Sequence, residues 1–547
     1  MCAPRRGLCQ PFANADSRDT SPLAATLKRD LGVNSLILTV VTGTIGSGWL
    51  FAPYFCARIA GPASLLAWVI GGVMAFLLAL VFAELGALVN SSGALAQLPL
   101  LSHGRLSGFI GGWSAWISYV SLPSIEVLAL LQYLSSVLPW LTRDVGSSQA
   151  LTGVGQLVAV ALLVLFTWIN LAGISQLARW IDGLTLWKLV VPLLVSISLM
   201  LIAGHWGNLQ LPVPEQQNTL VDAIGSGGVL FSLLGFRTAM DLAGEVRNPQ
   251  RNVPLAMGVG LGLCLLIYLV LQLGFLVSVP PEALQQGWSR LSLSAHGGPL
   301  VALATGLGLG WVATLLLIDA VASPGATGMA YLGISARVSW MMGECRLLPG
   351  ALGRLNRRGV PHWSLISSLV ISTILLWVAP SWQEVVSFLT STLIIALAMG
   401  PVSLLALRRQ LPNAPRRFQI PCPWLLSGMA FVMATWATSW SGREALEGAV
   451  LVIAVPSLIY ALSNAWKGQP IELTSGLWWA LYLGLLILDM KLFSTGQPLE
   501  LPMGWHLAVL AGLALAVMPL AVNSALKDAS PHALTPLTEP TGSPQST

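Results

Sequence analysis

Charged residues are scarce in this chain of 547 residues: they make up only 9% of it, whereas an ordinary soluble domain is about 25% charged. Hydrophobic residues account for 55% of the chain, and its mean hydropathy is +0.75. No soluble core could absorb so much apolar sequence, so the composition excludes a soluble globular protein. It predicts a membrane protein with many spans.

Motifs for metal, nucleotide or covalent chemistry are also lacking. The six histidines fall in loops or at span ends, with no H-E-x-x-H spacing, and no nucleotide-binding loop supports primary active transport. A membrane enzyme would need clustered catalytic groups at one depth. We therefore expect no enzymatic activity, no cofactor and no metal. The cysteines have neither metal-like spacing nor a paired framework and are interpreted as free thiols: Cys2, Cys9, Cys56, Cys264, Cys345 and Cys422.

The distribution of the 27 basic residues predicts the orientation. They collect in alternate loops, so the net charge of +5 does not indicate a nucleic-acid partner. With the N-terminus inside, most of them lie in cytoplasmic segments, and an excess of Lys and Arg there predicts an even number of spans with both termini cytoplasmic. Residues 1–30 lack the apolar region and cleavage site of a signal peptide. The outer loops hold Arg58, Arg143, Arg290, Arg443 and Lys491.

Apolar runs of about 20 residues, the length needed to span a bilayer, predict about fourteen spans. They lie at residues 31–53, 63–89, 106–138, 151–172, 183–203, 221–243, 254–279, 299–332, 364–379, 385–407, 423–440, 448–462, 476–493 and 505–522. The run after residue 299 is long enough to include a break.

These spans suggest four regions of the chain. Residues 1–30 form a cytoplasmic tail, and residues 31–408 form a ten-span core with repeats at 31–204 and 221–408. Residues 409–524 add four peripheral spans. Residues 525–547, rich in Pro, Ser and Thr, form a disordered cytoplasmic tail.

The first span contains an unusual stretch at residues 40–53, V-V-T-G-T-I-G-S-G-W-L-F-A-P. Gly43, Gly46, Ser47 and Gly48 occupy positions where a simple span would have Leu or Val. In hydrocarbon, a broken helix is tolerated only where its freed backbone groups face protein, water or a ligand. A break near the midplane is typical of a transporter binding site. Tight helix packing through small residues is the alternative.

The sixth span is also interrupted, near Gly235 and Arg237. Interrupted spans at matching positions of two halves are expected in a transporter with an inverted repeat. The letters I-G-S-G occur at residues 45–48 and again at 224–227. The second copy lies at the start of a span, and we interpret that match as chance.

Three motifs together resemble the amino acid–polyamine–organocation superfamily. They are T-I-G-S-G at residues 44–48, A-E-L-G-A-L at 83–88, and G-F-R at 235–237 running on to G-E-V-R-N-P-Q-R-N-V-P at 244–254. Within the superfamily, residues 46–51, 119–127 and 310–325 and the fourteen-span length are most similar to the bacterial aspartate/glutamate:proton symporters. The resemblance covers nearly the whole chain. It implies an all-α membrane protein with an inverted five-plus-five helix repeat, broken first and sixth spans, as in LeuT, and four additional spans.

The resemblance also implies a substrate site at the two breaks. The free amides of residues 46–48 would hold a substrate carboxylate, as the positive end of a half-helix favours an anion. Carbonyls near Thr44 and Leu234 would accept the ammonium group, next to Gly235. Phe231 matches an aromatic position that caps the substrate; ordinary core packing is the alternative for this residue.

Two ionisable residues inside predicted spans are candidates for proton coupling. Lys188 lies in the fifth span, where a lysine costs about 2.5–3.5 kcal/mol in lipid, so it should face the bundle interior. Burial disfavours its charged form, which makes proton exchange near neutral pH feasible. Proton-coupled relatives carry a lysine here; a static ion pair is the alternative. Glu126 in the third span either titrates or supports helix packing. Glu84 and Asp319 are left as structural or gating groups.

Arg237 bears most directly on the choice of substrate. Many superfamily members have Glu after the Gly-Phe pair, and this chain has Arg, which puts a proton role at this position in doubt. A free Arg237 could bind a side-chain carboxylate in a bidentate contact. A pair with Asp241, at i+4 on the same helix, is the alternative and would favour a neutral substrate.

We therefore expect a secondary active transporter of the bacterial cytoplasmic membrane that couples protons to an acidic amino acid by alternating access. The alternative is a permease or exchanger of neutral amino acids or amines with the same fold. A sensor of this fold that moves no substrate is a further alternative, and a flux assay would distinguish it from a transporter. The expected partners are the amino acid, protons and the lipid bilayer. The sequence leaves open the preferred amino acid, the stoichiometry, symport against exchange, the oligomeric state and the role of the last four spans.

Overall fold

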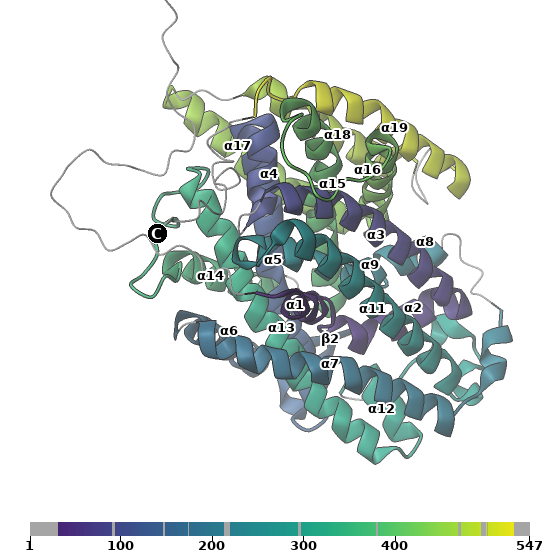
Figure 1. Ribbon diagram of the computed structural model, residues 1–547. Coiled ribbons are helices and arrows are strands. Elements are labelled where there is room, and N and C mark those ends of the chain that lie inside the picture. The colour runs from purple at the N-terminus through teal and green to yellow at the C-terminus, as the bar shows by residue number, and fades with distance from the viewer. Residues whose placement is uncertain are drawn as a thin grey trace, which may run out of the picture.

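The computed structural model describes residues 31–89, 93–145, 148–172, 174–212, 219–293, 297–378, 381–468, 472–493, 499 and 501–529. These residues form a helical bundle (Figure 1). The predicted N-terminal tail, and the C-terminal tail from residue 530 on, lie outside the described residues.

The chain orders its elements as follows. The α-helices are α1 (Val33–Thr44), α2 (Gly48–Ala60), α3 (Ser64–Leu88), α4 (Ala94–His103), α5 (Arg105–Leu134), α6 (Gly153–Ala172), α7 (Ile174–Ile202), α8 (Thr219–Gly225), α9 (Val229–Leu233), α10 (Thr238–Asp241), α11 (Pro249–Ser278), α12 (Pro299–Gly306), α13 (Gly310–Glu344), α14 (His362–Val378), α15 (Trp382–Gln410), α16 (Pro423–Trp440), α17 (Arg443–Trp466), α18 (Leu473–Leu492) and α19 (Met503–Asn523). The 3-10 helices are η1 (Gly61–Ala63), η2 (Pro139–Leu141), η3 (Trp206–Gln210), η4 (Leu234–Arg237), η5 (Ala243–Glu245), η6 (Pro281–Leu284) and η7 (Trp288–Arg290). Strands β1 (Thr142–Val145) and β2 (Ser148–Leu151) pair antiparallel, with Thr142 opposite Leu151.

Each predicted span coincides with one helix or with one interrupted set of helices. By length and composition, ten helical segments among the described residues could cross a membrane, and Val33–Thr44 and His362–Val378 are shorter apolar helices. The division into fourteen crossings and four regions stays a prediction. The chain is thus a multi-pass helical membrane protein, because these segments are too long and apolar for a soluble fold.

Some predicted boundaries were wrong. Helix α4 was not predicted, and His103 is a buried residue at its end. Helix α5 ends at Leu134, before the predicted residue 138, and α13 continues to Glu344, beyond the predicted residue 332. The break expected after residue 299 is present: α12 ends before Gly308, whose φ of +73° is left-handed. Apolar runs define the buried length of a helix poorly because helices extend into polar loops.

The two expected helix interruptions are present at the start of each half. Helix α1 ends at Thr44 and α2 begins at Gly48, which leaves residues 45–47 between them. Helix α8 ends at Gly225, and Gly228 has a φ of +94°, a conformation that glycine adopts without steric cost. The second I-G-S-G copy lies at this interruption, so both copies mark the end of a helix. The break is therefore longer than predicted, because η4 follows soon after α9.

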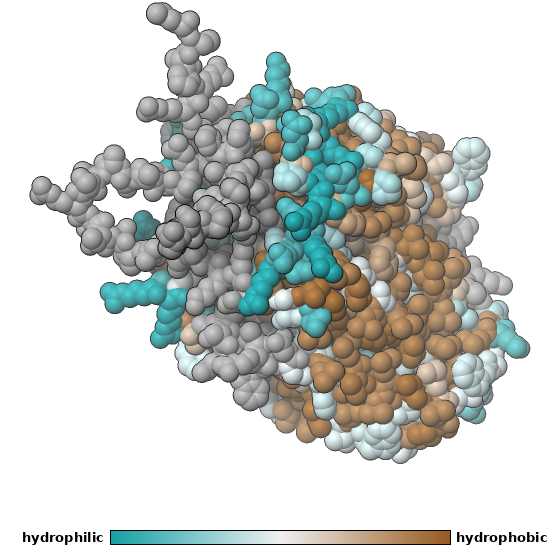
Figure 2. Space-filling model, in the orientation of Figure 1, coloured by the Kyte–Doolittle hydropathy of each residue, from teal (hydrophilic) through white to brown (hydrophobic). Residues whose placement is uncertain are grey.

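Helices α5 and α15 form the centre of the bundle. All of the most apolar stretch of α5 is buried, as is 89% of that of α15, against 33% for α6 and 28% for α17. The remaining apolar side chains of the peripheral helices face outward. Figure 2 shows a broad hydrophobic area bordered by a hydrophilic band. Such a surface fits lipid, because its large exposed apolar patches would not be tolerated in water.

Candidate functional site: a cavity between two broken helices

A narrow internal cavity lies where the two interrupted helices meet. Its free space of about 10 Å³ is close to the minimum for one water molecule. An amino acid would not fit, so the structure represents a closed conformation of this region. The cavity is lined by Gly43, Thr44, Gly46, Leu122, Glu126, Phe231, Arg237, Tyr331 and Leu389.

The two breaks touch at Gly235. A Cβ atom on this glycine would lie 2.5 Å from both the Cα and the backbone nitrogen of Thr44. Real side chains do not approach backbone so closely, so only glycine allows η4 to lie against the end of α1. The contact brings residues far apart in the sequence to one place.

The Glu126 carboxylate occupies the amide side of the first break. Its Oε2 accepts a hydrogen bond of 2.8 Å from the backbone N–H of Ser47. A Cβ atom on Gly46 would overlap this carboxylate. Since α2 begins at Gly48, Glu126 lies at the positive end of a helix, where an anion is stabilised. Of the amides predicted to hold a substrate carboxylate, that of Ser47 is bonded to Glu126 in this conformation; their role toward a substrate stays a prediction.

The Lys188 ammonium occupies the carbonyl side of the same break. Its Nζ donates to the carbonyl of Ile45 at 3.0 Å, to the Thr327 hydroxyl at 2.5 Å, and at 3.4 Å to the carbonyl of Thr42. Lys188 is fully buried and faces the bundle interior, as expected for a lysine in a span. Within the described residues, no direct ion pair joins Lys188 to Glu126. A cation and an anion thus satisfy the two ends of one broken helix.

Arg237 is 2% exposed and lies at the cavity wall. Its guanidinium carbon is 4.8 Å from the ring centre of Tyr119 and 5.3 Å from that of Tyr331. One of its N–H groups donates to the carbonyl of Leu234 at 2.5 Å. Cation–π contacts and a carbonyl hold the group in place without neutralising its charge.

Asp241 does not form the ion pair considered from the sequence. Its Oδ2 accepts a 2.5 Å hydrogen bond from the Tyr119 hydroxyl. Among the described residues, no salt bridge links Asp241 to Arg237, and both the Oδ1 of Asp241 and the Nε of Arg237 have no hydrogen-bond partner. Arg237 is the last residue of η4 and Asp241 the last of α10, so the two residues do not lie on one continuous α-helix as the i+4 spacing assumed.

The two carbonyls expected to accept a substrate ammonium already accept one hydrogen bond each. The carbonyl of Thr44 receives the Tyr268 hydroxyl at 3.0 Å, and that of Leu234 receives Arg237. A carbonyl oxygen has two lone pairs and can accept more than one hydrogen bond. Neither carbonyl is excluded as a ligand.

Aromatic rings cover the side of the cavity next to α2. Phe231 meets Trp382 edge to face, with ring centres 5.7 Å apart. Trp382 stacks on Phe51 at 4.8 Å, and its indole N–H donates to the Ser47 hydroxyl at 3.0 Å. Sequence analysis missed Trp382 and Tyr331, because nothing in their local pattern separates them from other buried aromatics.

The two carboxylates left as structural groups have fixed partners. Glu84 is buried and accepts hydrogen bonds from Arg408 at 2.6 Å and from the backbone N–H of Ile420 at 2.8 Å. Asp319 accepts hydrogen bonds from the Trp49 indole at 3.1 Å and the Ser323 hydroxyl at 2.8 Å. Both groups link helices that are distant in sequence.

Cysteine and metal-ligating residues do not add a second site. Cys56, Cys264, Cys345 and Cys422 are free thiols, and Cys2 and Cys9 lie outside the described residues. The described part of the chain contains no group of three His, Cys, Asp or Glu side chains placed to hold a metal ion.

Comparison with known proteins agrees with this architecture. The chain is 30% identical over 469 residues to the glutamate/serine transporter AimA of Bacillus subtilis, covering 84% of this chain and 86% of that one. It is 31% identical over 471 residues to the aspartate-proton symporter of the same organism, covering 84% and 89%. These relatives are transporters and not enzymes.

Solved structures show the same fold. The manganese transporter of Eremococcus coleocola aligns with a TM-score of 0.51 at 14% identity, over 95% of this chain and 99% of that one. At this identity the likeness concerns the fold, an inverted five-plus-five repeat with broken first and sixth spans. The amino acid permease family model matches residues 31–487. The chain therefore belongs to the amino acid permease family.

Proposed function

We propose that this permease is a secondary active transporter that carries an acidic amino acid together with protons by alternating access at the two broken helices. The observation that carries this proposal is the buried guanidinium of Arg237, which lines the cavity without a carboxylate partner among the described residues. A buried cation is costly unless an anion compensates it. The side-chain carboxylate of aspartate or glutamate would supply that anion.

Glu126 would couple the proton to the substrate by competing for one amide. In the closed cavity its carboxylate holds the Ser47 N–H, which is where the α-carboxylate of an amino acid would bind. A charged Glu126 and a substrate carboxylate repel each other at this position. Protonation of Glu126 removes the repulsion and frees the amide, so substrate and proton would bind together.

Lys188 would act as a titratable cation at the first break. Its contacts with Ile45 and Thr327 hold the interrupted α1 in the way that a bound metal ion would. Loss of its proton would weaken those contacts and loosen the break. We therefore assign Lys188 to the proton-coupling step together with Glu126.

The remaining predicted residues would complete the substrate site. The amides of residues 46–48 and the carbonyls of Thr44 and Leu234 would bind the α-carboxylate and α-ammonium groups, beside the glycine contact at Gly235. Phe231, which faces Trp382, would cap the substrate and move with it as the cavity opens.

A neutral amino acid is the second candidate substrate. The relative AimA is named for glutamate and serine, and serine has no carboxylate for Arg237. An amine is disfavoured, because its positive charge would face the guanidinium. The relative named as an aspartate-proton symporter supports the acidic substrate and the proton.

The orientation follows from the basic residues. The excess of Lys and Arg in alternate loops predicts that both termini lie in the cytoplasm. For a permease of this type we assign the protein to the bacterial inner membrane.

Uptake into proteoliposomes tests the proposed function. Radiolabelled aspartate would be offered with and without an inward proton gradient, and competed with unlabelled glutamate, serine, alanine and arginine. Accumulation that needs the gradient and is blocked by glutamate is the expected result. Absence of aspartate flux under every gradient would refute the acidic substrate, and gradient-independent flux would refute proton coupling.

A further inference from the structure

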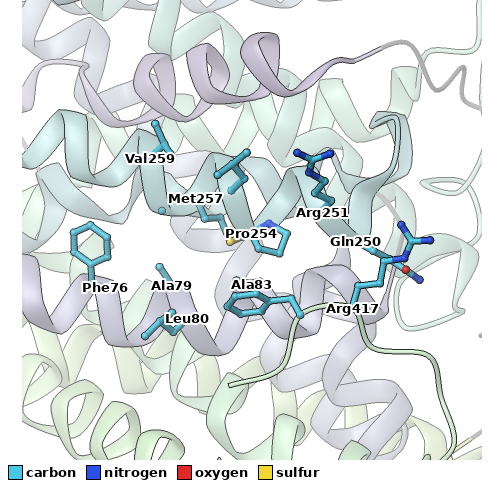
Figure 3. Close-up of a pocket in the computed structure, with 13 residues that line it drawn as sticks. Phe76, Ala79, Leu80, Ala83, Gln250, Arg251, Pro254, Met257, Val259 and Arg417 are labelled. Carbon is cyan, nitrogen blue, oxygen red and sulfur yellow. The ribbon is translucent and has the colours of Figure 1, made fainter. Parts of the chain in front are cut away.

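A second, larger cavity lies on the outer side of the bundle between α3 and α11. Its volume is about 630 Å³, within the range of about 300–1,000 Å³ that is usual for small-molecule sites. Its walls come from three segments: Phe76, Ala79, Leu80 and Ala83 of α3; Gln250, Arg251, Pro254, Leu255, Met257, Gly258 and Val259 of α11; and Arg417 and Phe418 of the α15–α16 loop. We call this cavity the α3–α11 groove (Figure 3).

The α3–α11 groove is polar at one end and apolar along the rest. Figure 3 shows Arg251, Gln250 and Arg417 at one end, while Phe76 and Val259 lie toward the other. The helical rise places Val259 about 12 Å along α11 from Arg251. Within the described part of the chain, no acidic residue lines the groove, so the groove fits an elongated ligand with a negative head.

The guanidinium groups of Arg251 and Arg417 are available to a ligand. Both side chains are exposed, and neither guanidinium forms an ion pair or a hydrogen bond with another residue in the described ranges. Arg416, next in sequence, differs in lying near the buried Glu84, at 3.8 Å. Helix α11 begins at Pro249, so the positive end of its dipole adds to the positive electrostatic potential at this end of the groove.

The apolar part of the groove faces the surroundings of the bundle. Leu80, Leu255 and Val259 are 37%, 43% and 46% exposed, so they belong to the outward-facing apolar surface of α3 and α11. The groove floor contains small residues: a Cβ atom on Gly258 would meet no other atom within 4 Å. Acyl chains fill such a space without competing with water.

We propose that the α3–α11 groove is a binding site for an anionic phospholipid, whose phosphate lies between Arg251 and Arg417 and whose acyl chains lie along α3 and α11. Basic pockets between membrane helices on the cytoplasmic side commonly bind anionic head groups. The positive-inside distribution places these two arginines on that side. The site is separate from the substrate cavity, which is lined by other residues.

Native mass spectrometry of the purified full-length protein tests this site, with phosphatidylglycerol and phosphatidylcholine titrated separately. The wild-type protein should retain phosphatidylglycerol in preference. The double variant Arg251→Gln/Arg417→Gln should bind it about 25-fold more weakly, about fivefold for each arginine. The matched control Arg354→Gln/Arg357→Gln, which removes two exposed arginines of the α13–α14 loop, should bind as the wild type does.

Two further arms test the groove itself. Gly258→Leu fills free space without a clash and should weaken lipid retention while leaving every charge in place. Glycerol phosphate, which has the head group without acyl chains, should not compete. Equal retention of the two lipids, equal loss in both double variants, unchanged binding in Gly258→Leu, or full competition by glycerol phosphate would each overturn the proposal.

Discussion

Replacement of Arg237 by methionine tests the proposed substrate site most directly. Methionine keeps a long flexible side chain in the space beside Tyr119 and Tyr331 but removes the charge and its donors. The substitution should weaken acidic substrates selectively, because only they carry a second carboxylate for the guanidinium. Neutral substrates should lose little.

The magnitude follows from the burial of the group. A hydrogen bond to a charged partner contributes about 1.5–3 kcal/mol, and each 1.4 kcal/mol is about tenfold in affinity. Arg237 is buried, so solvent screening does not reduce this value greatly. The half-saturating concentration of aspartate should therefore rise about 10- to 150-fold.

The measured quantity is the ratio of aspartate to serine affinity in competition for uptake by proteoliposomes. Arg237→Met also removes a hydrogen-bond donor to the Leu234 carbonyl. That loss should weaken the binding of every substrate equally, so it does not change the ratio of the two affinities. Arg237→Lys restores a charge without the planar fork and should recover part of the ratio.

Asp241→Asn is the matched control. Because Asp241 is bonded to Tyr119 and not to Arg237, its neutralisation should leave the ratio unchanged. The reasoning is refuted if Arg237→Met lowers aspartate and serine affinity equally. It is equally refuted if Asp241→Asn changes the ratio as much as Arg237→Met does.

Four other substitutions follow from the same contacts. Glu126→Gln should keep exchange of substrate but lose gradient-driven accumulation, since its side chain is permanently neutral; a flux that still follows the proton gradient would remove Glu126 from coupling. Lys188→Ala should also abolish accumulation, and full uptake would contradict its role. The free energy of unfolding should fall by about 1–3 kcal/mol, because the buried carbonyl of Ile45 loses its donor. Gly235→Ala should destabilise the protein by about 1–3 kcal/mol or prevent folding, as its Cβ meets the Thr44 backbone, and normal melting would show that the breaks do not touch. Glu84→Gln should lower the free energy of unfolding by about 3 kcal/mol. This is the low end of the range for breaking a buried ion pair, because Arg408 is 22% exposed. An unchanged melting temperature would show that the pair does not stabilise the fold.

Several features of this protein could be predicted from the sequence because they depend on local composition. Apolar runs of bilayer length identify the helices, and glycine clusters identify the interruptions, since backbone hydrogen bonding in lipid allows few other arrangements. The cost of a lysine in lipid was enough to turn Lys188 toward the interior, where the structure has it. Helix α4 and the C-terminal end of α13 were not predicted, because the extent of these segments depends on the helices packed against them.

The partners of each charged group were decided only by the tertiary structure. The i+4 spacing of Arg237 and Asp241 favoured an ion pair. In the structure, Arg237 at the end of η4 lies over the rings of Tyr119 and Tyr331. Asp241 instead accepts a hydrogen bond from the Tyr119 hydroxyl. Glu126 accepts its hydrogen bond from the Ser47 amide, 79 positions away in the sequence, and no local pattern relates the two residues. Local sequence determines where a helix forms or breaks, whereas side-chain contacts across the bundle depend on how distant helices pack, which is a property of the whole chain.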